Sequence, residues 1–274
     1  MKSKMSLTTD NELFSSFLEN DVLVIKQKQH ILHLTNDINT IFTFYEYLES
    51  MLTSKAFKAL AVFSHQETNA HVEHGSFLCK ALMATRDNKV MDRLANVANR
   101  LILTLSAING ITVYAGRGKV SLFHMNLSLA YDYRIMADDT VFENYNVDIG
   151  MITKGSGYYL PRLLGVKKAT EILQWKSFSA EDALQLGLVD RIVPAANLEE
   201  EAIRLASESM AGPSSALLAI RKLLKCDLKE LQRSLELEDS LIKERLESQE
   251  FKAMFSAYCM EKFGCDMETL RKAK

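Results

Sequence analysis

The first part of the chain alternates between short apolar runs and amphipathic stretches. Residues 22–25 favour a β-strand, and residues 29–35 alternate well enough to be its hairpin partner across the polar residues 26–28. Asn36 and Asp37 are typical helix caps, and the apolar positions that follow predict a helix to about Leu52. Residues 59–64 form an apolar run, as buried parallel strands often do. Residues 1–20 predict no more than a helical turn or a loose leader.

The middle of the chain has the pattern of a βαβ unit. A strand at residues 111–115 breaks at Gly116 and Gly118, and an apolar helix at 120–131 then leads to a second strand at 133–137. Two strands joined by a helix require parallel pairing. Helices are also expected at residues 77–83 and 90–105, after a polar loop over residues 65–75.

The second half of the chain becomes increasingly helical. Residues 169–175 predict a helix, Ser179 and Asp182 resemble a capping box that opens the next helix, and residues 188–193 predict a strand. From Asn197 onward only helical spacing occurs. We therefore expect an α/β core over residues 1–195 and a helical C-terminal region over residues 196–274.

Composition narrows the class of protein. With 274 residues, 47% hydrophobic and 25% charged, the chain is long enough to bury a core without disulfides or metal. A net charge of −2 gives no basic footprint for nucleic acid. The four cysteines have no CxxC spacing, and we find neither a signal peptide nor an apolar run long enough for a membrane span. These features indicate a cytoplasmic protein with free thiols.

Two blocks of sequence carry a resemblance to a known family. The first comprises residues 127–137, 148–150 and 160–165, and the second residues 178–194. In this order they resemble the crotonase (enoyl-CoA hydratase/isomerase) superfamily. The resemblance implies a core of stacked ββα turns and a helical C-terminal region used for assembly into a homotrimer or a dimer of trimers. It also implies an acyl-CoA thioester as substrate, lyase or isomerase chemistry of the kind found in fatty acid metabolism, and no cofactor beyond the coenzyme A of the substrate.

The resemblance also places a candidate oxyanion hole. In the family two backbone N–H groups bind the thioester oxygen, and such donors are usually the largest catalytic contribution. Setting Asp132 and Arg134 against the family's Asp-x-Arg places one donor on Phe123, where the family has glycine. The N–H group is retained, but the added ring either turns away or occludes the pocket. The other donor falls on His74, in a segment that lacks the family's aspartate, and its imidazole could act as acid or base.

The same register places amides where the family has its two catalytic glutamates. These positions are Asn126 and Asn146. An amide can orient a water molecule but cannot exchange a proton near neutral pH, so two-carboxylate hydration is not expected. Asp148 would share a face with Asn146 if both lay on one strand, and it is either a displaced carboxylate or an ordinary polar strand end.

Further charged positions leave alternatives open. Lys154 aligns where dienoyl-CoA isomerases have an acidic group, and it either pairs with a coenzyme A phosphate or is solvated. Lys262 follows Glu261 and resembles the family's C-terminal Glu-Lys, whose lysine reaches coenzyme A across a subunit boundary; a solvated lysine is the alternative. His124 is an acid/base candidate or a surface residue. The histidines of the 65–75 loop fit no standard metal spacing, so no metal is expected.

Two hypotheses of different classes follow. One is a crotonase-fold protein that binds an acyl-CoA thioester through the backbone amides of His74 and Phe123 and uses chemistry other than two-glutamate hydration. The other is a catalytically silent crotonase-fold subunit that works by binding or assembly, which the residues at positions 123, 126 and 146 favour. An α/β hydrolase is excluded because the sequence has no GxSxG motif.

Overall fold

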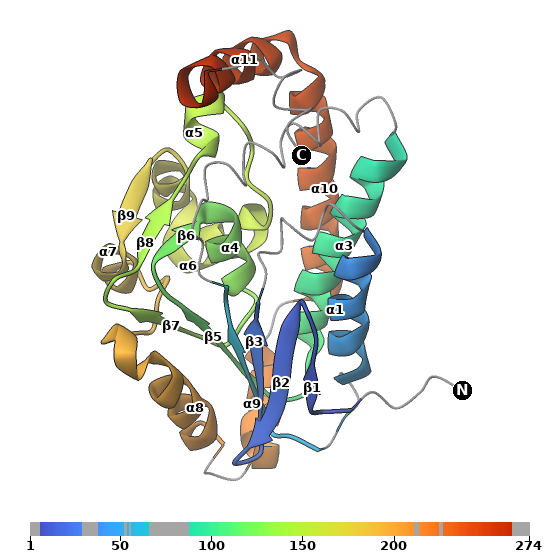
Figure 1. Ribbon diagram of the computed structural model, residues 1–274, viewed down its shortest axis with the longest axis vertical. Coiled ribbons are helices and arrows are strands. Elements are labelled where there is room, and N and C mark those ends of the chain that lie inside the picture. The colour runs from blue at the N-terminus through green and yellow to red at the C-terminus, as the bar shows by residue number, and fades with distance from the viewer. Residues whose placement is uncertain are drawn as a thin grey trace.

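A seven-stranded sheet runs through the middle of the molecule (Figure 1). The structure is a computed structural model that describes residues 6–28, 38–51, 54, 56–65, 88–210, 214–224 and 227–264. The strands lie in the order β1 (Thr9–Asp10), β2 (Phe14–Glu19), β3 (Val22–Gln27), β4 (Ala59–Phe63), β5 (Ile111–Gly116), β7 (Tyr133–Ala137) and β10 (Arg191–Val193). The pairings from β3 to β10 are all parallel, whereas β1, β2 and β3 pair antiparallel.

The N-terminal hairpin differs from the expectation. Residues 14–19, expected as a helical turn or a loose leader, form strand β2 and pair with β3. Asn20 and Asp21 connect the two strands with φ angles of 49° and 63°, the positive values that a two-residue hairpin turn requires. The residues expected to be the partner of β3, 29–35, lie outside the described residues, as does the helix expected at residues 77–83.

The expected βαβ unit is confirmed, with one refinement. Strands β5 and β7 pair in parallel, and helix α4 (Leu122–Ser128) lies between them in sequence. This helix is shorter than expected because a strand, β6 (Lys119–Ser121), occupies the residues just before it. The change from strand to helix between Ser121 and Leu122 is abrupt, and it presents the first turn of α4 at the end of a strand.

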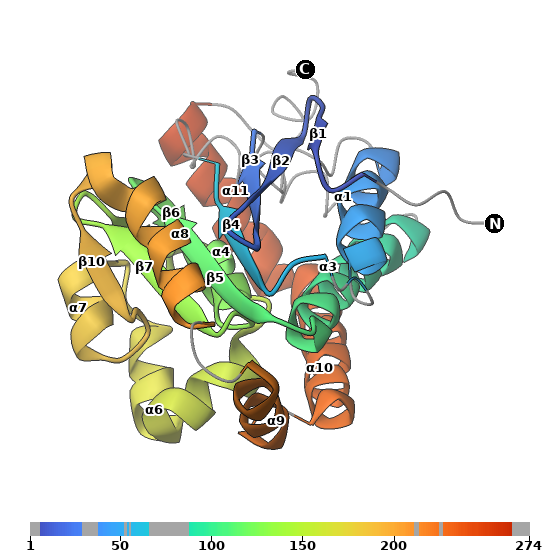
Figure 2. The same ribbon diagram turned by 90° about the horizontal axis from the view of Figure 1, so that it is seen from below.

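Helices cover both faces of the large sheet. On one face, alternate strand residues such as Val24 and Val113 pack against α8 (Leu198–Glu208). On the other, residues such as Ile25 and Leu60 pack with the apolar faces of α1 (Ile38–Met51), α3 (Asn88–Ala107), α4 and α10 (Leu228–Glu247). Figure 2 shows α8 on one side of the sheet and α1, α3 and α10 on the other. The sheet is therefore buried on both faces, as parallel sheets are.

A second, three-stranded sheet stands beside the first. It consists of β6, β8 (Val141–Glu143) and β9 (Ser177–Ser179). After β8 the chain forms the short helix α5 (Asn146–Ile149) and then α6 (Ser156–Ile172), which breaks at Gly165 with a φ angle of 73°. The expected capping box of Ser179 and Asp182 is present at the start of α7 (Ala180–Gln185).

The described part of the C-terminal region is helical, as expected. A short 3-10 helix, η2 (Ala195–Asn197), precedes α8, and α9 (Ser214–Leu224), α10 and α11 (Gln249–Phe263) follow it. Helix α10 packs against α3 and α6, and α11 lies over α5 at one end of the molecule (Figure 1). In the described residues no helix combines the length and apolar character needed to cross a membrane.

Candidate functional site

The start of helix α4 presents a backbone donor. Ser121 is the N-cap, and its hydroxyl accepts a hydrogen bond of 3.4 Å from the His124 amide. Phe123 is the second helical residue, so its N–H has no acceptor within the helix. No hydrogen bond from this N–H is found within the described part of the chain. The donor is therefore positioned at the positive end of the helix dipole, where a developing negative charge is stabilised.

The aromatic side chains beside this donor are held by packing. The Phe123 ring is half-buried, packs against the main hydrophobic core and contacts the His124 ring edge-on at 5.4 Å between centroids. His124 itself is buried, with Nδ1 2.9 Å from the Ser121 hydroxyl. The interpretation of His124 as a surface residue is therefore wrong, because its imidazole is buried and lies within hydrogen-bond distance of the N-cap residue of α4.

Asn126 is fully buried and has a fixed orientation. Its Nδ2 donates a hydrogen bond of 3.1 Å to the carbonyl oxygen of Lys154. A carbonyl can only accept, so the nitrogen and not the oxygen of the amide must face it. The Oδ1 atom is buried and has no hydrogen-bond partner in the described part of the chain. An unsatisfied buried acceptor is uncommon in folded proteins and indicates a place for a donor.

Asn146 reaches the same loop from another element. Its Nδ2 donates a hydrogen bond of 2.6 Å to the hydroxyl of Thr153, the neighbour of Lys154 in the chain. The two asparagines, which the resemblance sets against the family's glutamates, are therefore both anchored on residues 153–154. Each is held by an internal hydrogen bond, and neither is ionisable.

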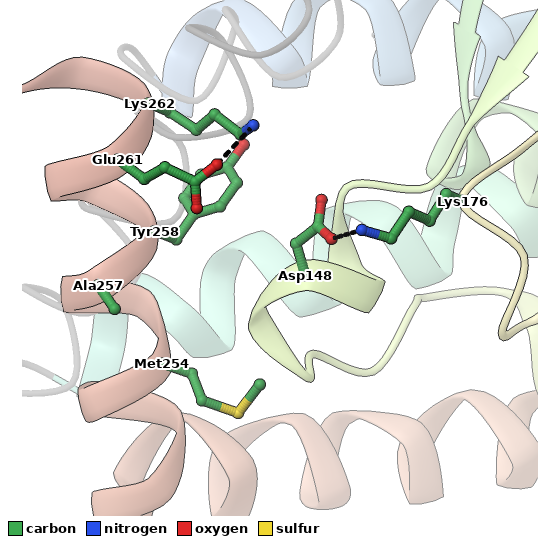
Figure 3. A pocket seen from close by; sticks show the side chains of 7 residues that line it. All are labelled: Asp148, Lys176, Met254, Ala257, Tyr258, Glu261 and Lys262. Atoms are coloured by element: carbon green, nitrogen blue, oxygen red, sulfur yellow. Dashed lines mark hydrogen bonds and ion pairs between the residues drawn. The ribbon is translucent and has the colours of Figure 1, made fainter.

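Asp148 does not share a face with Asn146. Residues 146–149 form helix α5 and not a strand, so two positions along the helix differ by about 200°. Asn146 points into the protein, whereas Asp148 is partly exposed and forms an ion pair of 2.5 Å with Lys176 (Figure 3). The expectation of a shared strand face was wrong because residues 146–149 form a single helical turn, which ends at Gly150 with a φ of 61°.

Lys154 is buried, which contradicts the interpretation that it is solvated. Its ammonium donates to the carbonyl oxygen of Leu235 at 2.7 Å and to Asp239 Oδ1 at 2.6 Å. The other oxygen of Asp239 accepts a hydrogen bond of 2.6 Å from Asn99 on α3. The lysine therefore connects the loop before α6 to helix α10.

Glu238 completes this cluster and was not expected from the sequence. Its two carboxylate oxygens accept hydrogen bonds from the backbone amides of Gly155 (2.7 Å) and Gly157 (2.6 Å), and Lys154 Nζ lies 3.7 Å away. Burial raises the pKa of Glu238 above its ordinary value, while the two amides and the lysine act in the opposite direction. The available sequence signal was that Glu238 lies on the same face of α10 as Leu231 and Leu235, where an apolar residue is normal.

Lys262 lines a pocket at the end of the molecule where α11 meets α5. The pocket has a volume of about 360 Å³ and is formed by Asp148, Lys176, Met254, Ala257, Tyr258, Glu261 and Lys262 (Figure 3). Lys262 Nζ lies 3.0 Å from Glu261. Tyr258 is buried, and its hydroxyl has no hydrogen-bond partner among the residues that the structure describes. Desolvation is the main cause that raises the pKa of Tyr258 to about 12. Lys262 thus lies beside α5 of its own chain.

The second expected donor, His74, lies outside the described residues, as do His71 and the rest of the segment 66–87. The relation of its amide to that of Phe123 stays a prediction. Within the described ranges, no group of three or more His, Cys, Asp or Glu side chains is arranged to hold a metal ion.

A comparison with models of known protein families identifies the family of this chain. The sequence model of the family "Enoyl-CoA hydratase/isomerase" matches residues 40–267. The chain belongs to this family. The resemblance recognised from residues 127–194 is therefore confirmed, together with the crotonase-like α/β fold and its helical C-terminal region.

Several solved structures have a similar fold. An enoyl-CoA hydratase from Bacillus halodurans is similar over 89% of this chain and 99% of its own, with 22% identity and a TM-score of 0.76. An enoyl-CoA hydratase from Mycobacterium avium subsp. paratuberculosis K-10 covers 90% of this chain and 96% of its own at 19% identity, with a TM-score of 0.67. A variant of HypX from Aquifex aeolicus covers 93% of this chain with 46% of its own length, at 14% identity and a TM-score of 0.73. At these identities the similarity shows the fold alone.

Proposed function

We propose that the protein binds an acyl-CoA thioester and polarises its carbonyl at the start of helix α4. The observation that carries the proposal is the Phe123 amide, a donor without an acceptor among the described residues, on the first turn of a helix that begins directly after a strand. It occupies the position that resembles the family's oxyanion donor. Loss of one such donor costs about 3–4 kcal/mol of transition-state stabilisation in enzymes of this kind.

The chemistry we propose is not hydration by two carboxylates. Asn126 and Asn146 stand at both glutamate positions, and each donates its amide hydrogens to an internal acceptor. Asp148 does not replace them, since it turns to Lys176 on the other side of α5. The arrangement favours reactions that need enolate stabilisation and a single acid/base group, such as isomerisation, in which one group removes a proton from one carbon and returns it to another. The imidazole of His74 is the group that the sequence analysis offers for this step.

A second function is favoured by the same two asparagines. If no side chain at the site moves a proton, the protein binds the thioester without turning it over and serves as a silent subunit of an assembly. Both functions share the Phe123 donor, and they differ in whether the α-protons of a bound thioester exchange with solvent. In either case we expect the homotrimer or dimer of trimers that the family resemblance implies, which light scattering of the purified protein would show.

The test separates binding from turnover. Crotonyl-CoA and butyryl-CoA are titrated into the purified protein by calorimetry. The same thioesters are then incubated in D₂O, and NMR follows exchange of the α-protons of butyryl-CoA and of the γ-protons of crotonyl-CoA. Binding with exchange supports the enzyme, and binding without exchange supports the silent subunit. If neither thioester binds at millimolar concentration, the proposed function is wrong.

Two substitutions at position 123 distinguish the backbone donor from the ring. Phe123→Gly keeps the amide and removes the ring, whereas Phe123→Pro removes the amide at a first-turn position where proline is tolerated. We expect Phe123→Gly to bind at least as tightly as the wild type and Phe123→Pro to lose about tenfold or more in affinity. Circular dichroism of both variants checks that α4 is retained.

A further inference from the structure

The peptide unit between Lys154 and Gly155 joins two buried side chains from distant parts of the chain. Its carbonyl oxygen accepts from Asn126 Nδ2 at 3.1 Å, and its N–H donates to Glu238 Oε2 at 2.7 Å. In a trans peptide these two groups point in opposite directions. Glu238 and Asn126 therefore lie on opposite sides of the 154–155 peptide.

Because residue 155 is glycine, the orientation of the 154–155 peptide depends on the groups that hydrogen-bond to it. Gly155 has a φ angle of +84°, and glycine occupies positive and negative φ about equally well. Backbone preference alone therefore does not stop the 154–155 peptide from turning over. The carboxylate of Glu238 selects one orientation, because it binds the N–H groups of both Gly155 and Gly157. Lys154 strengthens this by its own bonds to Leu235 and Asp239 on the same helix.

The orientation of the peptide determines the orientation of the Asn126 amide. As the structure stands, Asn126 must turn its nitrogen to the carbonyl, which leaves Oδ1 buried and without a partner. If the peptide turned over, the Gly155 N–H would face Asn126, and the amide would rotate to offer its oxygen. Its nitrogen, a donor, would then take the place of Oδ1.

We infer that Glu238 is a positioning residue that makes Asn126 present an acceptor to the ligand, and that the ligand carries a hydrogen-bond donor, such as a 3-hydroxyl group, at this point. The identity of the ligand as an acyl thioester rests on the proposed function. The role of Glu238 does not, because it follows from the contacts of the 154–155 peptide. A carboxylate on the C-terminal helix α10 thus controls which hydrogen-bonding group the site offers.

The first arm of the test examines the network without a ligand. In ¹⁵N-labelled protein the side-chain amide signals of Asn126 are assigned by their loss in Asn126→Asp. Glu238→Leu removes both acceptor oxygens and should shift the Gly155 amide signal and the Asn126 side-chain signals. Glu238→Gln keeps one oxygen and should give an intermediate shift. Glu236→Leu, an exposed position on the same helix, is the control and should leave these signals in place.

The second arm measures ligand polarity. Two thioesters of matched size are compared at mildly acid pH: 3-hydroxybutyryl-CoA, which offers a donor, and 3-oxobutyryl-CoA in its keto form, which offers only acceptors. We expect the wild type to favour the hydroxyl ligand by about tenfold, and Glu238→Leu to lose this ratio while Glu236→Leu keeps it. A general loss of fold would weaken both ligands together and leave their ratio unchanged.

The outcomes are separable. Asn126 signals unaffected by Glu238→Leu would overturn the inference, as would an unchanged ligand ratio in a variant that still binds. If Glu238→Leu does not fold, Glu238→Gln is the second variant: its side-chain nitrogen can only donate, so one of the two backbone amides loses its acceptor, and the Gly155 and Asn126 signals should shift in the same direction as expected for Glu238→Leu. If no thioester binds to any variant, the proposed function fails, and the Asn126 signals alone decide whether Glu238 sets the amide.

Discussion

Removing the ammonium of Lys154 should destabilise the protein far more than removing that of Lys176. Both lysines approach an aspartate closely, at 2.6 Å from Asp239 and 2.5 Å from Asp148, so their geometry is matched. They differ in burial, since the side chain of Lys154 is 9% exposed and that of Lys176 is 72% exposed. Lys154→Met and Lys176→Met therefore compare the same chemical change in two environments.

The magnitude follows from what Lys154→Met leaves behind. The buried Glu238 and the partly buried Asp239 would remain beside each other without their cation, and the Leu235 carbonyl would lose its donor. Breaking a buried ion pair by removing one partner costs about 3–5 kcal/mol. With an unfolding entropy of about 0.6 kcal/mol/K for 274 residues, this loss lowers the melting temperature by about 5–8 °C.

The assay is urea unfolding at neutral pH, followed by tryptophan fluorescence and circular dichroism at one fixed protein concentration. Trp175 is the single tryptophan, so far-UV circular dichroism is needed to report on the rest of the fold. Lys176→Met should give a curve close to that of the wild type, because exposed ion pairs contribute little. Equal losses in the two variants, or no loss in Lys154→Met, would refute the view that the cluster is buried and electrostatically coupled.

Two further predictions concern the titration of Glu238 and the space around two glycines, Gly110 and Gly116. Burial raises the pKa of Glu238 in the folded protein above its value in the unfolded chain. The stability that Glu238 contributes is therefore present below the unfolded pKa and is lost as pH rises through the folded pKa. In urea unfolding, Glu238→Gln should accordingly lose more stability relative to the wild type at about pH 4 than at about pH 7. Gly110→Ala would place a Cβ atom 2.7 Å from the backbone oxygen of Lys58 and should cost about 1–3 kcal/mol. In Gly116→Ala the nearest atom, at 2.9 Å, is the sulfur of the Met136 side chain, which can change rotamer where backbone cannot, so the cost in the same measurement should be lower.

The order of strands and helices in the core was predictable from the sequence because burial on both faces leaves long apolar runs. The strands at residues 59–63, 111–116 and 133–137 have this character, and so does the amphipathic pattern of α3. The N-terminal hairpin was missed because Phe14, Phe17 and Leu18 have the i, i+3, i+4 spacing of a helix. The better signal was Asn20-Asp21, two residues that accept positive φ.

The sequence predicted where the site residues lie along the chain, but it did not predict which residues of distant segments contact them. The strand-to-helix change at Ser121 was missed, because residues 120–131 have the character of a single apolar helix. The register of Phe123, Asn126 and Asn146 follows from the family resemblance. The burial of Lys154 depends on α10, which is more than 80 residues away in sequence. Hydrophobic periodicity describes which face of a helix is buried, but it does not say which charged residue of another element will meet that face.

We expect the residue that position 126 can hold to depend on Glu238. In the present orientation of the 154–155 peptide, a glutamate at position 126 would turn its carboxylate to a carbonyl oxygen in a buried site, where the Oδ1 atom of Asn126 has no donor among the described residues. Asn126→Glu alone should therefore lose about 3 kcal/mol or more in urea unfolding and gain no hydration of crotonyl-CoA. In the double variant with Glu238→Leu, the peptide is free to turn its N–H toward the new carboxylate, and the double variant should recover part of the stability lost by Asn126→Glu. If the two losses simply add, the two positions are independent, and the carboxylate on α10 has no bearing on which residue the site can hold at position 126.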